Sequence, residues 1–349
     1  MSDFIEQAQA RIRAAQASGT PLRIRGGGSK DFFGGELIGE VLDTRAHSGV
    51  IAYDPSELVL TVRAGTPLAE VEATLAASGQ CLPFEPPHFG AGATVGGCVA
   101  SGLSGPRRPY AGAVRDYLLG VSLIDGRGEA LRFGGQVMKN VAGFDTFRLQ
   151  AGAMGTLGLI TEVSFKVLPR PEADETRVFE STALDAIATM NRLAGQPLPL
   201  AGAIHLDGRL SLRLAGNPAA VIAAVAKLGG EPLADAAAFW ASIREQTHPY
   251  FAGDAPLWRL AVKPTAPPLA GDALIDWGGG LRWLRSAQTV AELRAIASLH
   301  GGHATAFRNG TRAQAFQPPA AAVMALHRRL KATFDPAGIL NRGRLYPEL

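Results

Sequence analysis

The sequence predicts an α+β protein with two differently composed parts. Up to about residue 170, short apolar runs typical of strands alternate with amphipathic helical patterns. Beyond that point, alanine-rich helical patterns alternate with further strands. The 42 glycines gather in residues 26–35, 90–112, 126–158 and 271–310, each group next to an apolar run. A chain of 349 residues is long enough for two domains with their own cores.

The N-terminal elements follow from local patterns. Residues 1–19 predict an amphipathic helix, because Asp3 and Glu6 interrupt any apolar stretch that a secretory signal would need. Residues 22–25 and 57–65 predict strands.

Residues 66–80 predict a helix with an identifiable start and end. Thr66 is a candidate N-cap, Pro67 suits the first helical position, and Gly79 ends the pattern. The residues expected on its apolar face are Leu68, Val71 and Leu75.

Two longer strands and a linker come next. Residues 117–128 predict a strand that ends in an Asp-Gly turn, and residues 157–169 predict a strand ended by proline. The segment 169–175, with its prolines and charges, is a plausible linker. After it we expect helices at 183–195 and 219–230, a strand at 211–216 and a last helix at about 319–334.

Composition excludes several classes of function. The net charge of +3 and the lack of a Lys/Arg block argue against nucleic acid as a partner. Two cysteines, Cys81 and Cys98, exclude a disulfide scaffold, a structural zinc site or an iron–sulfur cluster held by this chain alone, and we expect no metal. Since no run of eighteen apolar residues occurs, we expect a cytoplasmic protein that reaches the inner face of the cell membrane only peripherally, through partners.

Three glycine-rich loops carry the functional signal. The first, RGGGS at 25–29, follows a strand but fits neither a Walker loop nor a dinucleotide fingerprint. The second spans 90–105, and the third, AGAMGTLGLIT, spans 151–161. Successive backbone N–H groups in such turns form concave anion sites. Three such loops together could enclose a ligand that carries a diphosphate and a flat ring system.

The order of motifs resembles a known family. RGGGS, ATVGG, VMKNVAGFD, GTLGLITEVSF and FDPAGILNRGR follow one another as in the FAD-binding proteins of the vanillyl-alcohol oxidase and p-cresol methylhydroxylase (PCMH) type. In length and in residues 53–110 the chain is most similar to the smaller FAD-binding subunits of bacterial glycolate oxidases. The resemblance implies a PCMH-type fold of two α+β subdomains plus a smaller α+β cap domain. It implies an FAD-binding domain at 1–171, a cap at 172–305 and a C-terminal segment at 306–349 that returns to the FAD domain.

The resemblance also implies the residues that hold FAD. These are Gly26, Gly27, Gly28, Ser29, Thr94, Gly96, Gly97, Ser101, Gly102, Gly105, Gly155, Gly158, Ile160 and Asn341. Lys139 and Asp145 match the KxVAGYD segment and are expected to position the loop. Ser29 stands where many relatives carry histidine, so a histidyl link at that position is unavailable and we expect non-covalent FAD.

The catalytic residues are much less evident. Hydroxy-acid-oxidising relatives carry a histidine-rich cluster in the cap, and HGGHATAFRNG at 300–310 is its nearest counterpart here. His303 is a weak candidate for the base and Arg308 for a carboxylate clamp. His88, in EPPHFG, is a third weak candidate. A histidine pair at i, i+3 without a nearby carboxylate is poor metal-ligand evidence, so the catalytic residues remain unassigned.

The function implied is oxidation of glycolate within a complex. The substrate would be a small 2-hydroxy acid, glycolate with D-lactate as a second candidate, and the product the 2-oxo acid. The partners would be a large FAD-binding subunit and an iron–sulfur subunit that accepts the electrons. Two alternatives stay open: a non-catalytic FAD-binding assembly and relay subunit, and a stand-alone flavin oxidase of another alcohol.

Overall fold

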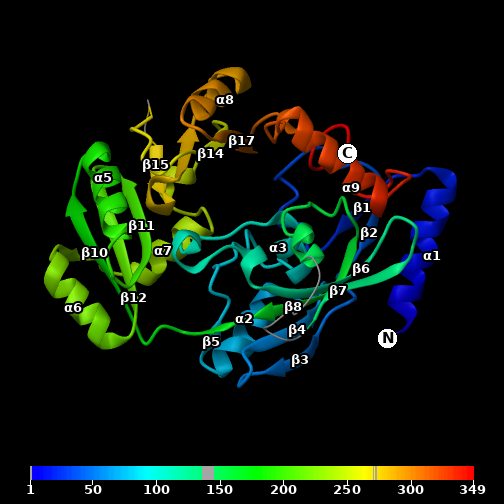
Figure 1. Ribbon diagram of the computed structural model, residues 1–349, viewed down its shortest axis with the longest axis horizontal. Helices are drawn as coiled ribbons and strands as arrows, with labels where there is room; N and C mark the ends of the chain where they lie inside the picture. Colours follow the sequence, from blue (N-terminus) through cyan, green and yellow to red (C-terminus); the bar gives the residue numbers. More distant parts are fainter. Residues whose placement is uncertain (1, 136–144, 270, 272) are drawn as a thin grey trace.

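Two β-sheets organise the molecule. The computed structural model describes residues 2–135, 145–269, 271 and 273–349. Figure 1 shows the strands of one sheet beside the N- and C-terminal segments, and those of the other in a separate lobe with helices α5 and α6. Mixed helix and sheet in both halves confirms the α+β prediction.

The first sheet has five antiparallel strands in the order β3-β4-β8-β6-β7. Their bounds are β3 Val50–Asp54, β4 Val59–Arg63, β6 Leu118–Ile124, β7 Ala130–Gly134 and β8 Leu159–Lys166. Strand β8 lies in the middle of the sheet and is mostly buried. The β6–β7 hairpin confirms the Asp-Gly turn, since the carboxylate of Asp125 accepts hydrogen bonds from the backbone of Arg127 and Glu129.

Helix α2, Leu68–Ala77, packs its predicted apolar face into the core of this sheet, with all three expected residues buried. The prediction of Thr66 as N-cap is wrong. Pro67 occupies that position without a side-chain cap. The hydroxyl of Thr66 instead donates to the carbonyl of Arg63 and accepts from the N–H of Gly49, so it ties two turns together.

A small parallel sheet packs next to the five-stranded sheet. Strand β1, Leu22–Arg25, pairs with β2, Glu40–Asp43. Helix α1, Ser2–Ser18, buries Ala8 and Ile12 against this pair. The N-terminal helix and the strand at 22–25 are therefore confirmed.

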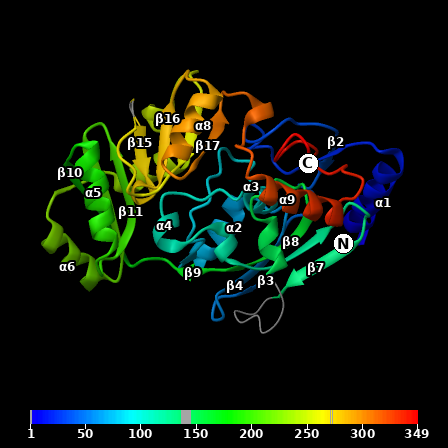
Figure 2. The same cartoon turned by 45° about the horizontal axis from the view of Figure 1, so that its top comes forward.

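The C-terminal segment returns to the N-terminal half. In Figures 1 and 2 the red C-terminal segment lies beside the blue β1, and Leu340 bridges Leu22 in parallel. Helix α9, Ala321–Phe334, precedes it. The buried ammonium of Lys331 donates to the carboxylate of Asp335 and to two backbone carbonyls, which anchors this segment.

The second sheet has eight antiparallel strands in the order β13-β10-β12-β11-β15-β16-β14-β17. Their bounds are β10 Ala173–Glu180, β11 Leu200–Leu206, β12 Arg209–Gly216, β13 Glu231–Pro232, β14 Leu257–Ala261, β15 Ala273–Asp276, β16 Leu281–Arg285 and β17 His303–Arg308. The helices of this part are α5 Ala183–Ala194, α6 Pro218–Leu228, α7 Ala236–Arg244 and α8 Val290–Leu299.

This sheet has two different faces. Helices α5, α6 and α8 pack on one face. The other faces the N-terminal half, where Leu274 and Trp283 share a buried cluster with Leu103 and Met154. We propose that the two large sheets mark two domains, with β17 running past the boundary expected at residue 305.

Short elements complete the chain. They are α3 Val95–Ser101, α4 Arg108–Ala111, β5 Gln80–Cys81, β9 Leu168–Pro169 and 3₁₀ turns at Val114–Asp116, Thr146–Gln150, Pro249–Phe251, Trp277–Gly279 and Arg312–Gln314. Within the described ranges, no helix has both the length and the apolar character needed to cross a membrane.

Candidate functional site

The three glycine-rich loops meet at one cleft of about 800 Å³, measured with its opening to solvent. Twelve of the fourteen residues expected at the cofactor line it. These are Gly26, Gly27, Gly28, Ser29, Thr94, Gly96, Gly97, Ser101, Gly155, Gly158, Ile160 and Asn341. Segments more than a hundred residues apart in the chain therefore share one wall.

Glycine is required where the first two loops touch. A Cβ atom on Gly27 would lie 1.5 Å from the carbonyl oxygen of Gly92, so only a backbone without side chains fits between them. A Cβ atom on Gly26 would similarly meet the hydroxyl of Thr94 at 2.3 Å. Thr94 itself caps α3 by accepting a hydrogen bond from Gly97 N–H. The first loop is thus held against the start of α3.

The first loop also presents unused hydrogen-bond donors. Among the residues that the structure describes, none accepts a hydrogen bond from the backbone N–H groups of residues 26–30. Gly28 adopts φ +73°, so the chain turns within this run. Consecutive amides in such a turn form a concave site for an anion. By contrast, the N–H groups of Val95, Gly96 and Gly97 are already bonded within the protein.

Positive charge surrounds these donors. The cleft is lined by four cationic side chains, those of Arg23, Arg25, Lys30 and Arg344, and by a single carboxylate, that of Asp31. Burial lowers the pKa of Lys30, and burial lowers that of Arg344 to about 10, which leaves the Arg344 guanidinium protonated at neutral pH. Such an excess of cations favours an anionic ligand.

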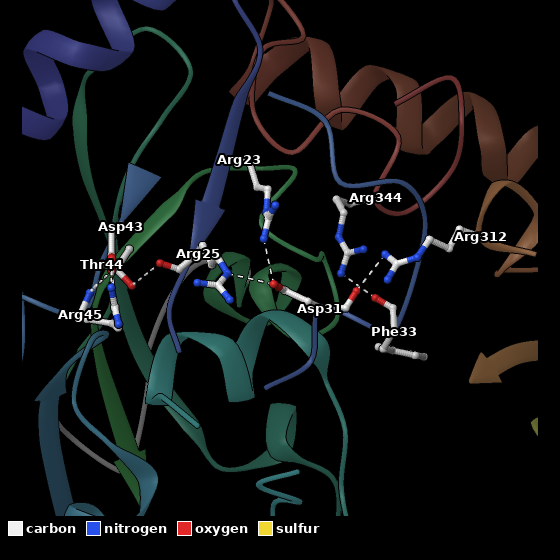
Figure 3. A network of polar contacts seen from close by, with 9 residues as sticks. All are labelled: Arg23, Arg25, Asp31, Phe33, Asp43, Thr44, Arg45, Arg312 and Arg344. Carbon is white, nitrogen blue, oxygen red and sulfur yellow. Dashed lines mark hydrogen bonds and ion pairs between the residues drawn. The ribbon is translucent and has the colours of Figure 1, made fainter. Parts of the chain in front are cut away.

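Asp31 holds two of these guanidinium groups in place (Figure 3). One oxygen of its carboxylate lies 2.8 Å from Arg23 Nη2 and 2.8 Å from Arg25 Nε. On the other side of the loop, Arg344 donates to the carbonyls of Gly35 and Phe33, at 2.5 Å each. Figure 3 shows all three arginines converging on the segment that follows the first glycine loop.

Two expected cofactor residues lie elsewhere. Gly102 ends α3 at φ +65° and packs against Gly152, and it does not line the cleft. Gly105 lines a different cavity, next to Glu85. Lys139 lies outside the described residues. Asp145, which is described, lies on the surface and pairs with Arg148 at 3.0 Å.

The three weak catalytic candidates do not form one site. His303 and Arg308 stand at opposite ends of β17, and the guanidinium of Arg308 stacks on Phe32, 4.4 Å from the ring centroid. Burial, and secondarily Arg259, lowers the pKa of His303. The Nε2 atom of His88 lies 3.2 Å from Glu72, in a third place. No group of three or more potential metal ligands occurs in the described part of the chain.

Sequence reasoning missed the cations of the cleft. Arg23 and Arg25 alternate along β1, so both side chains lie on one side of the strand, and this spacing was a usable signal. Arg344 gave no such signal, because it reaches the cleft only through the fold of the C-terminal segment. Free amides, a turn without side chains and four cations suit a ligand with two linked phosphates.

Comparison with known proteins shows which cofactor the chain binds. A family model described as "FAD binding domain" matches residues 4–134. The chain is 46% identical over 349 residues to the glycolate oxidase subunit GlcE of Escherichia coli (strain K12), covering 99% of both chains. It is 31% identical over 150 residues to the glycolate oxidase subunit GlcD of Bacillus subtilis (strain 168), covering 43% of this chain and 32% of that protein.

Solved structures support the fold. An alkyldihydroxyacetonephosphate synthase superposes with a TM-score of 0.65 at 17% identity, covering 96% of this chain and 75% of the other. The family match and the full-length relative show FAD as the cofactor and the PCMH-type FAD-binding fold as the architecture.

Proposed function

This chain belongs to the family of the glycolate oxidase subunit GlcE, and we propose that it is the FAD-binding subunit of a complex that oxidises glycolate to glyoxylate. The observation that carries the proposal is the likeness to a glycolate oxidase subunit along the whole chain, with a cleft suited to the cofactor in its N-terminal half. D-lactate is a second candidate substrate, because a D-lactate dehydrogenase of Anaerostipes hadrus is 31% identical over 178 residues.

Different residues of the cleft would bind different parts of FAD. The amides of residues 26–30 would bind the diphosphate, with Arg23 and Arg25 supplying charge beside it. Gly155, Gly158 and Ile160 would form the wall against which the rest of the cofactor packs. The β4–β8 pairing ends at Arg63–Glu162, so one backbone edge of Ile160 is left for a ligand. When bound, FAD supplies the acceptor for the electrons of the alcohol.

We propose that FAD is held without a covalent bond. Ser29 follows the three glycines of the first loop, and its hydroxyl is not a group that carries flavin in the resembling proteins. Acid precipitation of the purified chain tests this. The flavin should remain in the supernatant, whereas a yellow pellet would contradict the proposal.

The proposed partners are a large FAD-binding subunit and an iron–sulfur subunit. Support comes from the names of two relatives, which describe both as subunits of glycolate oxidase. The scattered positions of His303, Arg308 and His88 favour a second candidate, in which this chain binds FAD and relays electrons without turnover of its own.

One experiment separates the two roles. The isolated, FAD-loaded chain is mixed anaerobically with glycolate, and the flavin absorption band is followed. Bleaching supports turnover by this chain. No bleaching, with glycolate oxidation restored when the two partner subunits are added, supports the relay. Absence of glycolate oxidation in the assembled complex would overturn the proposed function.

A further inference from the structure

A second cavity lies between the inner face of the eight-stranded sheet and the N-terminal half. It measures about 380 Å³ with its opening. Aromatic side chains form its walls, namely those of Phe89, Trp277, Trp283 and Phe307. It adjoins the FAD cleft, because the ammonium of Lys30, which lines the cleft, lies 5.7 Å from the centroid of the Phe89 ring.

The register of the sheet places one acid and one base on this face. Arg259 of β14 pairs with Trp283 of β16, and Asp276 of β15 pairs with Leu281 of the same strand. Trp283 and Leu281 are two residues apart, so their side chains point to one face, and directly paired residues share a face. Arg259 and Asp276 therefore line the cavity together, on strands that flank β16.

Three polar groups of this cavity have hydrogen-bonding capacity left for a ligand. Within the described residues, no hydrogen bond or ion pair engages the guanidinium of Arg259, which stacks on Trp277, 4.9 Å from the ring centroid. Asp276 is 2% exposed and uses one oxygen for the N–H of Trp277, at 2.6 Å, with no cation bonded to it. Gln246 is 7% exposed, and its Oε1 atom has no partner.

Burying a polar group without a hydrogen-bond partner costs free energy, and a bound ligand can supply the missing partner. The backbone conformation around the cavity also supports a ligand site. Phe89, Gln246 and Trp277 line it at φ of 53°, 54° and 53°, in the left-handed region that such residues rarely adopt. Strained residues of this kind gather at ligand sites.

We propose that this cavity binds a small 2-hydroxy acid, whose carboxylate pairs with Arg259 and whose hydroxyl group accepts a hydrogen bond from the carboxyl group of Asp276. The ligand class rests on the proposed function, whereas the location rests on the cavity itself. A guanidinium matches a carboxylate with two parallel hydrogen bonds, and the second oxygen of a protonated Asp276 can donate to a hydroxyl oxygen.

The charges of the cavity tolerate an anion. Burial raises the pKa of Asp276 to about 8, so this group is mostly neutral at pH 7 and does not repel a carboxylate. Burial, together with neighbouring Arg108, lowers the pKa of Arg259 to about 10, which still leaves it charged. Glu85 is the other acid that acts on Asp276. His303 pairs with Ala261, two residues along from Arg259, so it lies on the same face but outside the lining.

Binding is measured on the full-length, FAD-loaded chain under anaerobic conditions. Two of the tryptophans line the cavity, so intrinsic fluorescence reports occupancy and the flavin band reports it independently. Glycolate and acetate are titrated separately, because acetate lacks only the hydroxyl group. Arg259→Gln should weaken the binding of both acids at least tenfold, and Arg259→Lys should recover part of the lost affinity.

Asp276→Leu separates the two contacts. Leucine cannot hydrogen-bond the hydroxyl group, so glycolate should bind about tenfold more weakly while acetate binds as before. The control is Arg209→Gln. Arg209 is an exposed arginine of β12 that pairs with Glu180, so this variant should bind both acids with wild-type affinity.

Equal glycolate affinity in the wild type and Arg259→Gln would overturn the site, and so would no glycolate binding to the FAD-loaded wild type. Neither result removes the proposed function, because FAD binding and oxidation by the assembled complex are measured separately. Failure of that complex to oxidise glycolate, with carboxylate binding still dependent on Arg259, would instead refute the function and keep the site.

Discussion

The side-chain oxygen of Asn341 accepts a 2.7 Å hydrogen bond from the backbone N–H of Ile24, in a residue pair that spans almost the whole chain. Its amide nitrogen donates to the carbonyl of Met154 at 2.6 Å. Asn341 itself has φ 44°. The side chain of Asn341 thus joins the strand before the first glycine-rich loop to the turn that carries the third glycine-rich loop.

Replacing this residue should loosen the cleft. Asn341→Leu leaves the N–H of Ile24 and the carbonyl of Met154 without partners, at about 1–3 kcal/mol each. We expect the free energy of unfolding in urea to fall by about 2–4 kcal/mol, with weaker FAD binding. Asn309→Leu is the matched control, because Asn309 has φ 58° and its side chain makes a single 3.5 Å hydrogen bond among the described residues. Equal losses in both variants would show that backbone strain alone is measured.

Charge beside the diphosphate should contribute to FAD affinity. Arg25→Gln removes one cation from the cleft while leaving Asp31 its contact with Arg23. We expect FAD to bind about tenfold more weakly at low salt, as for one lost charge-assisted contact, and the difference to shrink at 0.5 M salt. Isothermal titration at two salt concentrations measures both effects.

Arg45→Gln controls for net charge. Arg45 is exposed and pairs with Asp43 outside the cleft, as Figure 3 shows. A loss in this variant equal to that of Arg25→Gln would mean that the long-range field, and not the contact, sets the affinity.

Buried Asp276 should make stability depend on pH. Its pKa is raised to about 8 in the folded state, well above its ordinary value of 3.8, so the folded protein binds a proton that the unfolded chain releases. Stability is therefore lost as pH rises from about 4 to about 8, and changes no further above that. Asp276→Asn cannot ionise, so its stability relative to the wild type should grow between pH 5 and pH 8. Urea midpoints across this range that differ by a constant amount would contradict the assignment.

An ion-pair cluster connects the eight-stranded sheet to the N-terminal half. Arg213 of β12 lies 2.7 Å from Glu85 in the N-terminal half and 2.6 Å from Asp174. Burial by itself would lower the pKa of Arg213, but hydrogen bonding and charge from the two acids outweigh it and raise the pKa. Arg213→Leu leaves Glu85 half-buried without its partner, and we expect a loss of about 2–3 kcal/mol in unfolding free energy.

The double variant tests whether the pair itself is responsible. Adding Glu85→Gln to Arg213→Leu removes the unpaired charge and should recover part of the lost stability in urea unfolding. Strictly additive losses would show that Arg213 and Glu85 act separately.

Local signals predicted the regular elements, and long-range contacts decided the rest. The periodicity of Leu68, Val71 and Leu75 suffices to predict α2, because a helix is specified by residues close in sequence. The hydroxyl group of Thr66 could cap a helix, but it accepts a hydrogen bond from the N–H of Gly49 instead. Gly49 lies outside the local sequence pattern on which the prediction rested. The cap position therefore differed from its prediction.

The same distinction holds for the sites. Glycine loops could be predicted to share a ligand because each carries its signature within a few residues. Arg259 and Asp276 carry none, since their positions depend on strand pairing, and Arg344 lies in a sequence motif but reaches the cleft only through the returning C-terminal segment. That the cleft residues bind FAD stays a prediction.

The most direct test of this account is FAD titration of a variant whose cleft is filled. Gly97 lines the cleft, has an ordinary helical backbone, and a Cβ atom there would meet only Thr94 Oγ1, at 3.2 Å. Gly195→Leu is the control, because Gly195 has φ −85° and a Cβ atom there would meet only the carbonyl oxygen of Arg192, at an ordinary contact distance of 3.8 Å. With folding verified by circular dichroism, we predict that Gly97→Leu loses at least tenfold in FAD affinity while Gly195→Leu binds like the wild type. Unchanged FAD binding by folded Gly97→Leu would contradict the account.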